Sequence, residues 1–103
     1  MKIAVAAESE EKNSVISDRA GRASYYLIFD NSEEITETIK NPFGVGGGGA
    51  GFAVVKMLVD KGVDLIIAGK FGPNMIGAME ERGLKHQEAT GVVEEVIEGV
   101  LKK

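Results

Sequence analysis

The sequence predicts a single three-layer α/β domain, and three observations lead to this prediction. Two short apolar segments, Lys2–Ala7 and Val63–Ala68, are typical of strands buried on both faces of a sheet. Segments with helical spacing of apolar residues alternate with strands in the second half of the chain. The turn signal Asn31-Ser32 separates two further segments of strand character. This order implies that the first, fourth and fifth strands are parallel and are joined by right-handed crossovers.

The N-terminal half supplies one buried strand and one hairpin. After Lys2–Ala7, the polar stretch Glu8–Ser17 is expected to be a loop in which the carboxylates are solvated. Ser24–Asp30 is rich in aromatic and branched residues and predicts a second strand, with its aromatic side chains in the core. Glu34–Lys40 alternates apolar and polar positions and predicts a half-exposed third strand, antiparallel to the second.

The C-terminal half alternates helices with strands. Gly51–Lys61 is expected to be a helix with Val54 and Leu58 toward the core, and Gly62 is expected to stop it. The remaining predicted elements are a helix over Gly72–Arg82 with Pro73 in its first turn and Gly83 at its end, a fifth strand over Leu84–Ala89, and a last helix capped by Thr90.

Composition narrows the function classes. The chain has 103 residues, a net charge of −4 and a pI near 5.0, which argue against a nucleic-acid binder. No apolar run reaches the length needed to cross a membrane, and the N-terminus is interpreted as a strand, not a signal peptide. The absence of cysteine excludes disulfides, thiolate nucleophiles and iron–sulfur clusters ligated by this chain's own thiolates. A cytoplasmic location is expected, and the Glu- and Lys-rich composition favours a thermophilic source.

The fold class predicts where a ligand would bind. In an open α/β sheet, ligands bind at the carboxyl ends of the strands, at the point where the strand order reverses. If the first strand lies between the second and the fourth, four segments meet there. They are Glu8–Arg22, Gly44–Gly51, Gly69–Asn74 and Ala89–Gly91. Amide groups at the start of the first helix would favour an anion at this edge.

The glycine run does not fit either common nucleotide motif. Gly44, Gly46 and Gly49 satisfy the dinucleotide pattern, but Asn41-Pro42 precedes them where a strand is required, and Asp64 begins its strand instead of ending it. A Walker A loop requires Gly-Lys-Ser/Thr, which is absent.

Enzymatic chemistry is not supported by the sequence. A two-metal nuclease needs an acid within the first strand, and Lys2–Ala7 has none. Ser14 and Ser17 have no histidine nearby in the sequence to act as a base. His86, the only histidine, is expected to be an edge-strand residue and not a metal ligand. The protein is therefore predicted not to be an enzyme.

Two blocks carry a resemblance to a known family. "SDRAGRASYYLIFD" (Ser17–Asp30) and "GAGFAVVKMLVDKGVDLIIAGKFGPNMIGAMEERGLK" (Gly49–Lys85), followed by "TGVVEEVI", resemble the dinitrogenase iron–molybdenum cofactor biosynthesis family, which includes NifX-type carriers and the C-terminal domain of NifB-type proteins. The resemblance covers nearly the whole chain. It implies a ribonuclease H-like fold with sheet order 3-2-1-4-5, and a protein that carries iron–sulfur or iron–molybdenum cofactor precursors.

The sequence departs from the family at one important position. Relatives that bind cofactor commonly have Ser-x-His-Phe-Gly-Arg-Ala, whereas this chain has Arg19 and Ala20 at the His and Phe positions. A guanidinium has no lone pair to give to iron, so direct ligation at Arg19 is not expected. Arg19 and Arg22 could instead pair with an anionic cluster or a carboxylate-bearing ligand. The candidate binding residues are Ser17, Arg19, Arg22, Gly46, Gly47, Gly48, Gly49, Gly69 and Asn74.

Two functional hypotheses remain open. The first is a small carrier that binds an anionic cofactor precursor at the carboxyl ends of the first and fourth strands. The second is a regulatory or scaffolding domain that keeps the fold, has lost the cluster and acts through protein contacts. The protein is expected to be a monomer or a homodimer formed through an exposed sheet edge.

Overall fold

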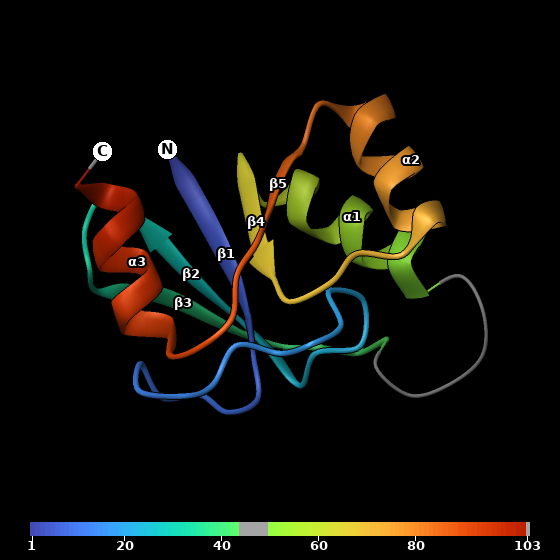
Figure 1. Ribbon diagram of the computed structural model, residues 1–103. Coiled ribbons are helices and arrows are strands. Elements are labelled where there is room, and N and C mark those ends of the chain that lie inside the picture. Colours follow the sequence, from blue (N-terminus) through green and yellow to red (C-terminus); the bar gives the residue numbers. More distant parts are fainter. Residues whose placement is uncertain (44–49, 103) are drawn as a thin grey trace.

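A computed structural model describes residues 1–43 and 50–102, and these form a five-stranded mixed sheet with helices on both faces (Figure 1). The strand order is β3-β2-β1-β4-β5, as the resemblance implied. The strands are β1 (Lys2–Ala7), β2 (Tyr25–Asp30), β3 (Ile35–Lys40), β4 (Leu65–Ala68) and β5 (Lys85–Glu88). The helices are α1 (Ala50–Asp60), α2 (Pro73–Arg82) and α3 (Val93–Leu101).

Strand β1 is the centre of the sheet and determines its topology. It pairs antiparallel with β2, from Lys2 opposite Asp30 to Ala7 opposite Tyr25. On its other side it pairs parallel with β4, and β4 in turn pairs parallel with β5. The predicted parallel and antiparallel pairings are therefore confirmed, and the strand order reverses between β1 and β4.

The two faces of the sheet have separate cores. Helices α1 and α2 cover one face, where Val54, Leu58 and Met79 are fully buried, and α3 covers the other face with Val93 and Ile97 (Figure 1). Apolar side chains at helical spacing explain why each helix packs on one side only. Within the described residues, no helix is long and apolar enough to cross a membrane.

The predicted element boundaries hold within two residues, but the predicted cap of α3 is wrong. Thr90 does not cap this helix; its N-cap is Val92, which offers no side-chain hydrogen bond. Carbonyl groups of the stretch between β1 and β2 replace the side chain, because the Val93 N–H donates to the Ser14 carbonyl at 2.9 Å and the Glu94 N–H to the Lys12 carbonyl at 3.0 Å.

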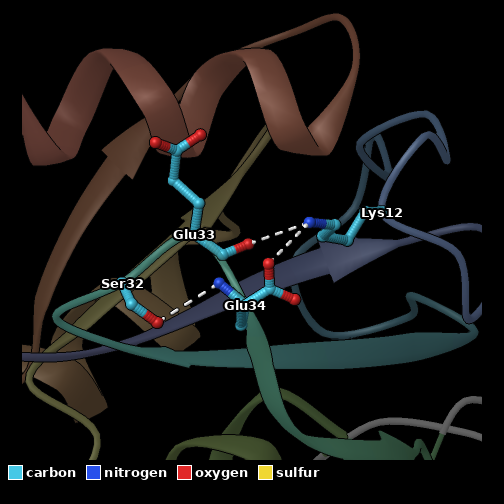
Figure 2. A network of polar contacts seen from close by, with 4 residues as sticks. All are labelled: Lys12, Ser32, Glu33 and Glu34. Carbon is cyan, nitrogen blue, oxygen red and sulfur yellow. Dashed lines mark hydrogen bonds and ion pairs between the residues drawn. The ribbon is translucent and has the colours of Figure 1, made fainter.

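The stretch between β1 and β2 is more ordered than a solvated loop. Its carboxylates are exposed as expected, yet Ser14, Ile16 and Ser17 are buried. Figure 2 shows how Lys12 ties this stretch to the β2–β3 turn, with its Nζ 3.3 Å from the Glu33 carbonyl and 3.5 Å from a Glu34 carboxylate oxygen.

Gly83 ends α2 in the left-handed conformation, with φ of 71°, and this position is testable. We expect Gly83→Ala to lower the free energy of unfolding by about 1 kcal/mol, because a Cβ is strained at positive φ. Gly77, inside the same helix with open space around it, is the matched control. Gly77→Ala should raise stability by up to about 1 kcal/mol. Urea unfolding measures both, and equal shifts for the two variants would contradict the assignment.

Candidate functional site

A cavity with a volume of about 510 Å³ lies at the carboxyl edge of the sheet. It is lined by residues 19–22, by residues 70–72 after β4, and by residues in the first turns of α1 and α2. Of the four segments predicted to meet, Glu8–Arg22, Gly69–Asn74 and Ala89–Gly91 do so through backbone hydrogen bonds and the cavity lining. The predicted glycine run, residues 44–49, lies outside the described residues.

Backbone hydrogen bonds hold residues 17–22, the segment that contains Arg19 and Arg22, against the sheet. The Gly69 N–H donates to the Ser17 carbonyl at 2.8 Å and the Ala20 N–H to the Lys70 carbonyl at 2.9 Å. The Ser17 N–H donates to the Ala6 carbonyl at 2.8 Å, so this segment is attached to both β1 and the end of β4. The buried Ser17 hydroxyl donates to the Arg19 carbonyl at 3.3 Å and accepts from the Arg19 N–H at 3.4 Å, which shapes the turn that presents Arg19.

Close contacts with neighbouring atoms explain why two positions near the cavity are occupied by glycine. A Cβ on Gly69 would lie 2.8 Å from the Asp18 Cα and 3.1 Å from the Ser17 carbonyl oxygen, so only glycine lets the segments pair. At Gly51, in the first turn of α1, a Cβ would lie 3.1 Å from the Met75 Cβ. This small residue brings the starts of α1 and α2 together at the cavity.

A second hydrogen-bond network contacts carbonyl groups in and next to the segment of residues 17–22. The Asn41 amide donates to the Ala23 carbonyl at 2.9 Å, the Gly21 carbonyl at 3.3 Å and the Tyr26 hydroxyl at 3.3 Å. Its Oδ1 accepts from the Phe43 N–H at 2.9 Å. The Tyr26 hydroxyl donates to the Ala20 carbonyl, and burial raises the pKa of Tyr26 above its usual range.

This network was not predicted as part of the site. The sequence predicts only that Asn41 stops a strand and that Tyr26 is a core side chain. One signal was present in the sequence, because a tyrosine at an inward position of a buried strand needs a partner for its hydroxyl.

The cavity is electropositive. Arg19, Arg22 and Lys70 line it, and none of the lining residues that the structure describes is acidic. The N-terminal turns of α1 and α2 also face it, and α2 begins at Gly72 without a side-chain cap. Helix N-termini carry partial positive charge and favour anions. A neighbouring cavity of about 430 Å³ shares both arginines but contains Glu8 and Asp18, so it is less suited to an anion.

The predicted site residues have different positions in the structure. Arg19, Arg22 and Asn74 line the larger cavity. Ser17 and Gly69 are not among its lining residues but form hydrogen bonds within the segments that line it, and Ser17 lines the neighbouring cavity. Lys70 and Phe52 also line the cavity, and neither is among the residues predicted from the sequence. The signal for Lys70 was its place directly after a buried strand and a glycine.

The described residues do not offer a metal-binding cluster. No group of three or more His, Cys, Asp or Glu side chains converges in this part of the chain. His86 is exposed on the edge strand β5, as predicted, and its ring packs on Phe71 with centroids 4.9 Å apart. It is not among the residues that line the cavity.

Substitution of Gly69 tests whether the backbone pairing places the arginines. We expect Gly69→Ala to lower the free energy of unfolding by about 1–3 kcal/mol, because the added methyl collides with backbone that must shift. Amide resonances of residues 17–20 should move. Gly72→Ala is the matched control, since a Cβ there meets nothing within 4 Å. Unchanged stability and spectra for Gly69→Ala would contradict this account.

The raised pKa of Tyr26 predicts a loss of stability in alkali. Below the ordinary tyrosine pKa of 10.0 both states keep the proton, so the stabilisation is fully present. Above 10.0 the unfolded chain releases the proton before the folded protein does, and stability falls. Tyr26→Phe should be less stable by about 1 kcal/mol at neutral pH. The wild type should approach it above pH 10, as measured by urea unfolding, and a pH-independent difference would contradict the prediction.

Comparisons with known proteins agree with this fold. A family model described as dinitrogenase iron-molybdenum cofactor matches residues 1–103. The apo form of the orange protein from Desulfovibrio gigas has the same fold, with a TM-score of 0.90 and 24% identity over 98% of this chain and 87% of that chain. A putative NifB protein from Thermotoga matches with a TM-score of 0.79 and 29% identity, again over 98% and 87%. A search of curated proteins gave no match.

The family match covers the whole chain, and the strand order and layers of the structure are those that the resemblance implied. The chain therefore belongs to the dinitrogenase iron-molybdenum cofactor family.

Proposed function

We propose that this protein binds and carries an anionic iron–sulfur or iron–molybdenum cofactor precursor in the cavity beside Arg19 and Arg22, and that it does so without catalysing a reaction. The observation that supports this most directly is the charge of the cavity. Its three cationic side chains and two helix N-termini surround one space, with no acid among the described lining residues. Family membership makes a cofactor precursor the plausible cargo.

The residues present indicate how such a cargo would be held. The chain has no cysteine, and its one histidine is outside the cavity lining, so the precursor would keep its own sulfide or organic ligands. Guanidinium groups donate several hydrogen bonds in a fixed geometry and bind anions strongly. In this proposal Arg19, Arg22, Lys70 and Asn74 contact the cargo, while Ser17 and Gly69 hold the lining segments in place.

The glycine run that was predicted to bind the ligand is also part of the proposal. Gly46, Gly47, Gly48 and Gly49 are proposed to contribute backbone amides to the cargo, on the basis of the sequence alone. A cytoplasmic location, a thermophilic source and a monomeric or dimeric state stay predictions from the sequence.

The alternative is a regulatory or scaffolding domain that has lost the cluster. The specific observation in its favour is the Arg19 position, where cofactor-binding relatives commonly have histidine, together with the absence of cysteine. Such a domain would keep the fold and act through protein contacts instead of cargo.

The experiment is anaerobic size exclusion of the purified protein mixed with an iron–sulfur cofactor precursor, with quantification of the iron that co-elutes. We expect stoichiometric iron with the wild type. The Arg19→Ala, Arg22→Ala double variant should weaken binding by about a hundredfold or more, since two charged hydrogen-bonding groups are lost. Retention should also decrease as salt increases.

The matched control is the Arg82→Ala, Lys85→Ala double variant. It changes the net charge by the same amount, and both residues are exposed outside the cavity lining. It should retain iron like the wild type. Absence of iron with the wild-type protein would reject the carrier function and favour the scaffolding alternative, whereas equal loss in both double variants would show that net charge, not the cavity, retains the iron.

A further inference from the structure

An exposed aromatic side chain lies in the electropositive cavity. Phe52, in the first turn of α1, is 51% exposed and is one of only three large hydrophobic residues that are exposed in the described part of the chain. It lines the same cavity as Arg19 and Arg22. An exposed aromatic ring costs free energy that burial against a ligand would recover, and the carriage of a bare inorganic anion does not use it.

The rest of the cavity lining also combines apolar surface with positive charge. Pro73 at the start of α2 is exposed and contributes apolar surface, while Lys70 adds a cation next to the two arginines. The cavity volume of about 510 Å³ falls within the range of roughly 300–1,000 Å³ that is typical of sites for small organic ligands. Such sites combine mostly apolar walls with a few polar groups that fix the ligand's orientation.

We propose that the cavity binds a small organic polyanion with a flat apolar face. Its acidic groups pair with Arg19, Arg22 and Lys70, and its apolar face packs on the Phe52 ring. The inference concerns the same site as the proposed function and rests on it for the location. It adds one requirement to the proposed function: the ligand must carry an apolar part as well as anionic groups.

Two probes that differ in this respect test the proposal. Naphthalene-1,3,6-trisulfonate carries three anionic groups on an aromatic face, and tripolyphosphate carries a higher negative charge with no apolar surface. Calorimetric titration at one fixed low ionic strength, with chemical-shift mapping, measures the affinity and location of each probe. We expect the wild type to bind the trisulfonate at least about tenfold more tightly than tripolyphosphate, a difference that one aromatic contact with its buried area can supply.

Substitution at Phe52 separates the two contributions. Phe52→Ala should weaken trisulfonate binding about tenfold and leave tripolyphosphate binding unchanged, and Phe52→Leu should be intermediate because it keeps apolar area without the ring. Val15→Ala is the control, since Val15 is 57% exposed but does not line this cavity. The Arg19→Ala, Arg22→Ala variant should weaken both probes.

The outcomes distinguish this inference from the carrier function. Tripolyphosphate binding that equals trisulfonate binding, no effect of Phe52→Ala, or shifts that map elsewhere would overturn the inference, even if iron co-elutes in the anaerobic experiment. Preferential trisulfonate binding that depends on Phe52 would support it, even if no iron is carried. Failure of the wild type to bind either probe would overturn it as well.

Discussion

The contact on which the rest of the site depends is the close approach of residues 17–20 to Gly69 and Lys70. Two backbone hydrogen bonds of 2.8 and 2.9 Å join them, and they form only because Gly69 has no side chain to keep the segments apart. The sheet topology makes the approach possible, since β1 and β4 are parallel neighbours and their following segments leave the same edge. Without this contact, Arg19 and Lys70 would not line one cavity.

The three helices differ in what their N-termini face, and this difference concentrates positive charge on one side of the molecule. The first amides of α3 are satisfied by carbonyl groups of Lys12 and Ser14 within the protein. The first turns of α1 and α2 instead face the cavity together with the cationic side chains. A chain with a net charge of −4 thus has a local electropositive cavity, which its overall composition does not indicate.

Most of the fold could be predicted from the sequence, whereas only part of the site could. Continuous apolar strands and helices with one apolar stripe are local patterns, so the order and type of the elements follow from them. Arg19 and Arg22 were predicted from the resemblance to the family motif, and Asn74 was predicted from its place in a segment that the topology brings to the same edge. The roles of Asn41 and Phe52 depend on contacts between distant segments, and no local pattern reports those, whereas Lys70 had a local signal in its place directly after a buried strand. The cap of α3 was missed for the same reason, because its hydrogen-bond acceptors come from the loop after β1.

The pairing between residues 17–20 and 69–70 also has a consequence for how the protein becomes competent to bind. Ser17 and Gly69 are 52 positions apart in the chain, so their hydrogen bond cannot form until β4 has docked beside β1. The β2–β3 hairpin can form early from local contacts, but closing such a long loop is slow. During synthesis the arginines are therefore made long before their cavity exists. The cavity is therefore a property of the completed sheet, and a growing chain does not yet have it.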